Sequence, residues 1–181
     1  MLDVTFSTAV PRSGEYGQSM DDLAAYDRLV AGLDEPVYIV TVAHGGTRAG
    51  CLIGFGGQVS IDPRRFLACL SDKNRTYRVA AAGAAHLAVH RVPEGARELA
   101  ELFGGATGDD VDKFARCAWH EGPRGVPLLD DCPDWFAGAV LERRVLGDHV
   151  GFLLEPVAAG HRGVPWLARG AVEDIDPGHG A

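Results

Sequence analysis

The fold of this chain is decided by a glycine-rich stretch, Ala49-Gly50-Cys51-Leu52-Ile53-Gly54-Phe55-Gly56-Gly57-Gln58-Val59-Ser60, which is followed by Ile61-Asp62-Pro63. Its glycines lie among bulky apolar residues, which is not the composition of a flexible linker. The stretch is therefore predicted to be strand and turn in which other groups approach the backbone closely. Two interpretations remain open, because such glycines either relieve crowding at the corners and bulges of a barrel or make room for a flat or bulky ligand.

Further along, the polar residues Lys73-Asn74-Arg75-Thr76 open a predicted helix over residues 77–82, which stops at Gly83. Amide, hydroxyl and cationic side chains at the start of a helix can bind an anion such as a phosphate. The same residues can also form an ordinary helix cap, which is the commoner role of Asn and Thr. The cationic side chains of Lys73 and Arg75 favour the phosphate interpretation modestly.

Strand patterns dominate the chain, and helices are inserts between them. A capping box, Ser19-Met20-Asp21-Asp22, opens a helix that ends at Gly32, and further helices are predicted over residues 93–103 and 109–117. Hairpins and short helices as connections favour an antiparallel barrel over a doubly wound parallel sheet. The predicted strands are residues 37–43, 48–56, 65–70, 85–91, 134–145 and 149–156.

Composition indicates one globular domain. The chain has 181 residues, of which 46% are hydrophobic and 23% are charged. Its net charge of −8 argues against broad binding to nucleic acid or to anionic membranes, because both need a basic face. The N-terminus lacks a signal-peptide pattern and no apolar run has the length of a membrane span, so we expect a cytoplasmic protein with reduced cysteines.

Two of the predicted strands, residues 37–43 and 49–55, are apolar on both faces. One face can fill a small barrel, whereas the other would be an exposed apolar patch on a monomer. We expect a second copy of the chain to cover that face, which predicts a homodimer.

These features resemble the flavin reductase-like family of FMN-binding split barrels. A family pattern like N-G-M-T-V-S-S-F-T-S-V-S-L-D-P falls on residues 49–63, and Asn74 and Thr76 meet the family's small-polar-x-Thr phosphate element. The family's Gly-Asp-His signature is Gly147-Asp148-His149 here. The remaining matches are Gly50, Val59, Ser60, Asp62 and Pro63 within the pattern, and Asp112-Lys113-Phe114 and Val126-Pro127-Leu128 as the Lys-Phe and Gly-x-Pro landmarks.

The resemblance implies an antiparallel split β-barrel with helical inserts over residues 24–157, and an NAD(P)H-dependent flavin oxidoreductase. Residues 1–23 would be an N-terminal arm with the start of a helix, and residues 158–181 a tail that is loose except where Trp166 and Leu167 dock. The implied cofactor is FMN, or FAD, the donor is NADH or NADPH, and reduced flavin either feeds a partner monooxygenase or passes electrons on in place. Homodimers that share the cofactor pocket are usual in the family. The implied flavin contacts are Gly50, Cys51, Leu52, Ile53, Gly54, Phe55 and Gln58, and the implied phosphate contacts are Lys73, Asn74, Arg75 and Thr76.

The chain departs from the family along the flavin strand, which keeps a second function open. Leu52, Gly54 and Phe55 stand where many relatives carry hydroxyl groups, so flavin contacts there would come mainly from the backbone. His149 faces away from the apolar side of its predicted strand, and the resemblance places it near the flavin and the nicotinamide as the catalytic residue. The alternative function is a non-catalytic split barrel that carries or senses flavin, deazaflavin or haem.

A zinc site is the main alternative to a flavin site. Cys117, His120 and Cys132 begin with a C-x-x-H spacing. A closed zinc site needs four ligands, however, and the fourth would have to come from Asp130, Asp131 or a distant residue. We therefore expect no metal site, and we interpret Cys117 as a packing residue. The chain also has no Walker loop, GxGxxG, HExxH or GxSxG motif.

Overall fold

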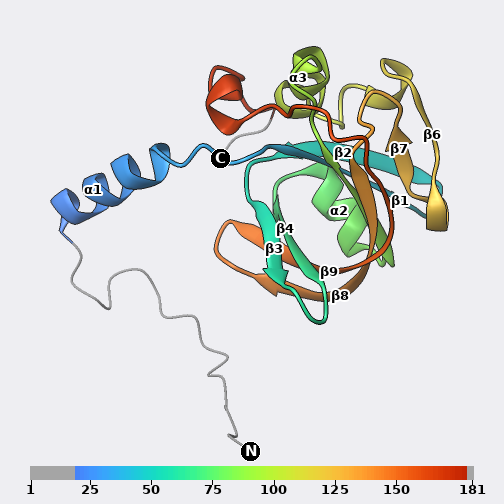
Figure 1. Ribbon diagram of the computed structural model, residues 1–181, viewed down its shortest axis with the longest axis horizontal. Helices are drawn as coiled ribbons and strands as arrows, with labels where there is room; N and C mark the ends of the chain where they lie inside the picture. Colours follow the sequence, from blue (N-terminus) through green and yellow to red (C-terminus); the bar gives the residue numbers. More distant parts are fainter. Residues whose placement is uncertain (1–18, 179–181) are drawn as a thin grey trace, which may run out of the picture. The chain divides into compact units, whose positions relative to one another are not determined.

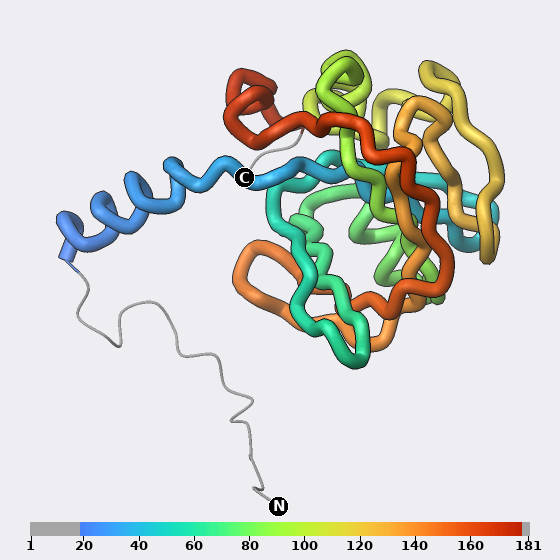
Figure 2. The backbone as a smooth tube through the Cα atoms, in the orientation of Figure 1, coloured from blue at the N-terminus to red at the C-terminus, as the bar shows by residue number. Residues whose placement is uncertain are grey.

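The computed structural model of the chain describes residues 19–178 (Figures 1 and 2). Contacts divide the chain into two units, residues 1–34 and residues 35–181, which are described separately. Among the helices of the described part, none is long and apolar enough to cross a membrane.

In the first unit, α1 (Met20–Ala31) begins at the predicted capping box. The Ser19 hydroxyl accepts the backbone N–H of Asp22 at 3.1 Å, and the Asp22 carboxylate accepts the backbone N–H of Ser19 at 3.3 Å. The helix ends at Gly32, as predicted. Both ends of this helix are thus set by local signals.

The second unit is built on one antiparallel barrel sheet. The strands of the main sheet are β1 (Tyr38–His44), β2 (Thr47–Ile53), β3 (Gly56–Ser60), β4 (Arg65–Ser71), β5 (His86–Arg91), β8 (Trp135–Val145) and β9 (His149–Gly160), and β6 (Trp119–Glu121) and β7 (Pro127–Leu129) form a separate ribbon. The seven strands follow the order β2-β1-β5-β8-β9-β4-β3, and each neighbouring pair is antiparallel. The N–H of Cys69 donates to the Phe55 carbonyl at 3.0 Å, which links the chain after β2 to β4. The predicted mainly β architecture, an antiparallel barrel with helical inserts, is confirmed.

Two helices lie on opposite faces of β2. In Figure 1, α2 (Arg75–Ala81) lies within the ring of strands and α3 (Arg97–Gly105) lies outside it. Contacts of α2 with β1 and β2, and of α3 with β2, fix this arrangement. The helix α2 starts two residues before the predicted residue 77, and Asn74 caps it, because Asn74 Oδ1 accepts the Thr76 N–H at 2.9 Å.

Alternate residues of β1 face two separate apolar cores. Val40 and Val42 pack inside the barrel. Ile39 belongs to a second core outside the barrel, with Phe103 of α3 and Leu129 of β7. The chain thus covers the outer face of β1 with its own elements, and the expectation that this face needs a second copy of the chain is wrong.

The predicted helix over residues 109–117 is also wrong, since only η1 (Lys113–Ala115) forms there. Acidic residues at its start suggested a longer helix, but their carboxylates have other partners. Asp109 pairs with two arginines of α2, and Asp112 accepts the Phe114 N–H at 3.1 Å. Long-range ion pairs and a short turn therefore replace the helix.

Two further boundaries and two short strands differ from the prediction. The helix α3 starts later than residue 93, because Pro93 pairs with Trp166 in an isolated bridge. The strand β2 ends at Ile53, and β3 begins as a new strand at Gly56. The short strands β6 and β7 were not predicted; each has three residues, too few for a periodic pattern.

The segment after residue 158 is packed against the barrel rather than loose. The strand β9 continues to Gly160. The buried carboxylate of Asp134 then accepts the N–H groups of Arg162 at 2.5 Å and Gly163 at 3.0 Å. Leu167 is buried in the outer core, as predicted, and η3 (Arg169–Val172) follows it.

Candidate functional site

A cavity of about 450 Å³ lies between the end of β2, the β4–α2 loop, α3 and the segment after β9. Its walls are mainly apolar, and polar groups come from the β4–α2 loop and the start of β9. The predicted site residues that line it are Leu52, Ile53, Gly54, Phe55, Lys73, Asn74, Arg75 and His149. Among the other lining residues are Phe103, Gly104, Thr107, Gly108 and Lys113 from α3 and the loop after it, and Arg169, Val172, Glu173, Ile175 and Pro177 from the C-terminal segment.

The glycine-rich stretch lines this cavity with its middle part. Gly50 lies beneath α3, where a Cβ atom would come within 2.6 Å of Phe103 Cε1, so this glycine relieves crowding. Cys51 is buried in the barrel core, and burial raises the pKa of its thiol to about 11. Gln58 lines a different cavity, beside Arg65. The structure thus does not bring Cys51 and Gln58 into the cavity, and Gly50 lines a neighbouring polar cavity instead.

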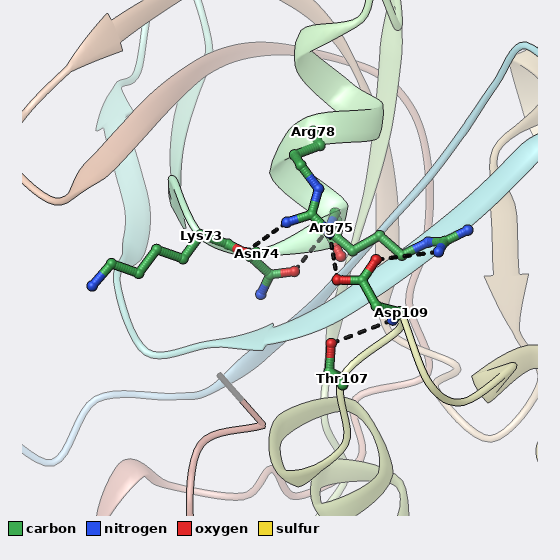
Figure 3. Close-up of polar contacts among 7 residues, drawn as sticks. Lys73, Asn74, Arg75, Arg78, Thr107 and Asp109 are labelled. Atoms are coloured by element: carbon green, nitrogen blue, oxygen red, sulfur yellow. Dashed lines mark hydrogen bonds and ion pairs between the residues drawn. The ribbon is translucent and has the colours of Figure 1, made fainter. Parts of the chain in front are cut away.

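The β4–α2 loop brings polar groups to the cavity through Lys73, Asn74 and Arg75 (Figure 3). Thr76, the next residue along the chain, lies deeper in the protein than these three residues. Its side chain is buried, with 1% of the residue exposed, and it lines an adjoining polar cavity of about 400 Å³. Within residues 19–178 its hydroxyl makes no hydrogen bond of ordinary geometry, and its polar neighbour is the buried thiol of Cys51, a weak hydrogen-bonding group. A buried hydroxyl without a strong partner is costly, which is the situation a bound polar ligand would relieve.

Asp109 places a carboxylate beside the same loop. It lies 3.3 Å from Arg75 Nη1 and 2.5 Å from Arg78 Nη2 (Figure 3). The hydrogen bond from Arg78 is the main reason why the pKa of the Asp109 carboxyl lies below its ordinary value. An anion that binds at this loop therefore competes with Asp109 for the guanidinium groups.

Lys113 holds a buried ammonium group between the two cavities, with 5% of the residue exposed. Its Nζ donates to the carbonyls of Gly50 at 3.2 Å and Phe103 at 2.9 Å. Burial lowers the pKa of this ammonium group. The Lys-Phe landmark was the only sequence signal for this residue, and it did not show that the charge would be buried at the site.

His149 lies at the other polar part of the cavity, at the start of β9. Its Nδ1 donates to Asp148 Oδ1 at 2.9 Å, and this hydrogen bond lowers the pKa of the Asp148 carboxyl. The imidazole also contacts Phe55 edge to face, with 5.2 Å between ring centroids. The guanidinium carbon of Arg169 lies 5.5 Å from the centroid of the same Phe55 ring. An imidazole, an aromatic ring and a cation thus meet at one place.

The rival zinc interpretation finds no support in the geometry. Cys117 Sγ donates to the Lys113 carbonyl at 3.4 Å, and His120 pairs with Asp130 at 2.5 Å. Cys132 is buried in the outer core. Over the described range of residues 19–178, no group of three or more His, Cys, Asp or Glu side chains is arranged to hold a metal ion.

The cavity has the chemistry of a site for a planar organic ligand that carries an anionic group. Its volume lies in the range of small-molecule sites, and its apolar walls suit a flat ring system. Lys73 and Arg75 suit a phosphate. Such a site can bind and align ligands. In reactions that a cofactor performs, binding and alignment are what the protein contributes.

Comparison with known proteins gives a consistent result. Residues 30–167 match the family described as Flavin reductase like domain. The chain is 30% identical over 142 residues to FMN reductase (NADH) RutF of Methylorubrum extorquens, which is 78% of this chain and 68% of that protein. The chain spans about two thirds of the length of the curated FMN reductases it matches.

Solved structures agree on the fold. The NADH:FAD oxidoreductase SgcE6 of Streptomyces globisporus has a TM-score of 0.71 and 23% identity, over 80% of this chain and 86% of that one. Nitrilotriacetate monooxygenase component B of Mycobacterium thermoresistibile has a TM-score of 0.69 and 22% identity, over 79% of this chain and 78% of that one. At these identities the similarity concerns the fold of the barrel.

Proposed function

Because this chain belongs to the family of flavin reductase-like domains, we propose that it is a flavin reductase, which transfers a hydride from NADH to FMN or FAD. The observation that carries this function is that one cavity joins the apolar wall at residues 52–55 to the cationic loop at residues 73–75. The curated relative, named as an FMN reductase that uses NADH, supports both the flavin and the donor.

The residues present fit a flavin. Leu52 and Phe55 offer apolar surface to the ring system, and a Cβ atom at Gly54 would meet only the Arg169 side chain, at 4.0 Å. Backbone groups at Gly54 can therefore approach a flat ring, which replaces the hydroxyl groups missing from this strand. The phosphate belongs on the loop that carries Lys73 and Arg75. When bound, the flavin supplies the atom that accepts the hydride.

The side chains around the cavity align the reactants. The hydrogen bond to Asp148 and the contact with Phe55 fix the imidazole of His149, which lines the cavity where a nicotinamide can be oriented. The buried ammonium group of Lys113 adds a fixed positive charge, which favours negative charge in the cavity.

We also propose a homodimer in which the second copy lies on the outer face of β3, β4 and β9. Leu67 and Leu153 pair on this face and are only half-buried. Val59 and Leu146 are 54% and 47% exposed. The face continues to His149 at the cavity, because His149 and Leu153 point to the same side of β9. An apolar face next to the site fits a second copy that also shields the cofactor.

The partner that we propose for the reduced flavin is a monooxygenase in the same cytoplasm. The support is that a protein of the same fold is named component B of a monooxygenase. Reduced flavin would leave the cavity and be used by that partner.

The test of the function is NADH oxidation by the purified protein with FMN, with FAD and without flavin. We expect turnover only with a flavin, and a visible flavin spectrum that bleaches with NADH in the absence of oxygen. A protein that binds FMN but whose flavin is never reduced by NADH would instead be the non-catalytic carrier.

A further inference from the structure

The C-terminal segment 168–178 lies beyond the residues that match the family, yet it forms a wall of the cavity. In Figure 1, η3 of this segment lies beside α3. The wall is therefore a feature of this chain that the family resemblance does not explain.

Contacts along the segment hold this wall in place. The backbone N–H of Arg169 donates to the Glu35 carbonyl at 2.8 Å. Arg97 of α3 pairs with Asp174 at 2.6 Å and donates to the carbonyl of Ala171. The position of the Arg169 side chain thus follows from a backbone that is tied to the barrel at several points.

The guanidinium group of Arg169 is available to a ligand. It lies over the ring of Phe55, which is 48% exposed, and its Cδ atom lies beside Gly54. Arg75 and Arg97 each pair with a carboxylate, whereas Arg169 makes no ion pair with any carboxylate of residues 19–178. An arginine on an exposed aromatic ring at a cavity is suited to an anionic group on a planar ligand.

The proposed reaction involves phosphate groups other than the single phosphate of FMN. Lys73 and Arg75 suit the single phosphate of FMN, but a dinucleotide brings a pyrophosphate as well. The two donor edges of a guanidinium group match the paired oxygens of a pyrophosphate better than an ammonium group does. His149 contacts the same Phe55 ring, so a dinucleotide at Arg169 would have its reactive ring close to the flavin.

We propose that Arg169 binds the pyrophosphate of a dinucleotide, and that this dinucleotide is the NADH donor. The proposal rests on the proposed reductase function. FAD carries the same pyrophosphate, so the experiment has to separate the two sources.

The experiment measures binding to the full chain by calorimetry in Arg169→Ala and Arg169→Lys variants. The probes are ADP-ribose on FMN-loaded protein, and FAD and FMN on flavin-free protein; ADP-ribose has the pyrophosphate of NADH without its nicotinamide. The control is Arg162→Ala, an exposed arginine between β9 and the C-terminal segment that does not line the cavity. We expect Arg169→Ala to weaken ADP-ribose binding by about tenfold or more, and Arg169→Lys to recover part of it.

Steady-state kinetics give a second readout. The KM for NADH should rise in Arg169→Ala while kcat stays near the wild-type value, because the lost contact exists before and during hydride transfer. A loss of affinity for FAD alone would overturn the assignment to NADH. Equal losses for FMN and FAD, or no loss for any probe, would overturn the pyrophosphate site. Absence of NADH oxidation by the wild type would refute the reductase function, whereas ADP-ribose binding reports on Arg169 separately.

Discussion

The Nε2 atom of His90 accepts a hydrogen bond from the backbone N–H of Leu129 at 3.2 Å, so a buried imidazole joins β5 to β7. The other ring nitrogen therefore carries the proton and donates to the Ile39 carbonyl at 3.0 Å. Burial lowers the pKa of His90 to about 4, which keeps the ring neutral. Since Leu129 belongs to the outer core with Phe103 of α3, this contact supports one wall of the cavity.

The first prediction follows from that pKa. We expect the free energy of unfolding to fall as the pH drops from about 6.5, the ordinary value of histidine, to about 4. In this window the unfolded chain binds a proton at His90 that the folded chain does not bind, which costs about 1 kcal/mol of stability per pH unit. Urea denaturation over this range measures the slope, and His90→Gln should reduce it. Identical slopes in both proteins would contradict the assignment.

The second prediction concerns the phosphate loop. Asn74→Ala should weaken FMN binding about tenfold, because it removes a polar contact to a charged group, and should leave riboflavin binding unchanged, because riboflavin has no phosphate. Asn74→Asp keeps the helix cap but adds a negative charge, so it should lose FMN affinity without losing stability. If both variants bind FMN like the wild type, the phosphate lies elsewhere.

Thr76→Val tests the same site from the buried side. The substitution removes a hydroxyl group whose polar neighbour among the described residues is only the weakly bonding thiol of Cys51, so stability should change little. Because we expect this hydroxyl group to contact the phosphate, FMN affinity should fall about tenfold. An unchanged FMN affinity would remove Thr76 from the site.

The third prediction concerns Asp109, whose carboxylate pairs with Arg75 and Arg78. Asp109→Asn should raise FMN affinity by roughly twofold to fivefold, because a phosphate then no longer competes with a carboxylate for the guanidinium groups. The gain should shrink in high salt. Titrations at low and high ionic strength measure both effects, and a weaker FMN affinity in the variant would show that Asp109 positions the arginines rather than competing.

The fourth prediction is that His149 serves the reductive step more than flavin retention. His149→Ala should raise the KM for NADH or slow hydride transfer, while FMN stays bound. Asp148→Asn weakens the hydrogen bond that orients the imidazole and should give a smaller effect in the same direction. Stopped-flow reduction at the wild-type rate and with the wild-type NADH dependence would remove His149 from this role.

The fifth prediction tests the proposed homodimer. Leu146→Asp places a charge on the exposed outer face and should give a folded monomer with weakened flavin binding. Val40→Asp should instead unfold the protein, because Val40 lies in the barrel core. Light scattering of the wild type at micromolar concentration decides the point: a monomer that is fully loaded with flavin would refute the dimer and the shared pocket.

Local patterns were enough to predict the elements that depend on neighbouring residues. The Ser19 capping box and Gly32 bound α1, and the Asn74 cap opens α2. Runs of β-branched and apolar residues predicted most strands of the main sheet, because strands that pack in a barrel core need apolar residues along their length. The cationic loop at residues 73–75 and His149 were likewise found from the sequence, and both line the cavity.

Only the tertiary structure decided which residues meet at the cavity. Lys113 is a site residue because its ammonium group donates to the carbonyls of Gly50 and Phe103. The fold brings these residues together although Gly50 lies far from the other two in the sequence. The helix predicted to begin at Asp109 does not form there, and the Asp109 carboxylate instead pairs with Arg75 and Arg78 of α2. Arg169 reached the cavity because the C-terminal segment packs back across α3. Such contacts join residues far apart in sequence, and their free energy exceeds the weak local preferences that a pattern reports.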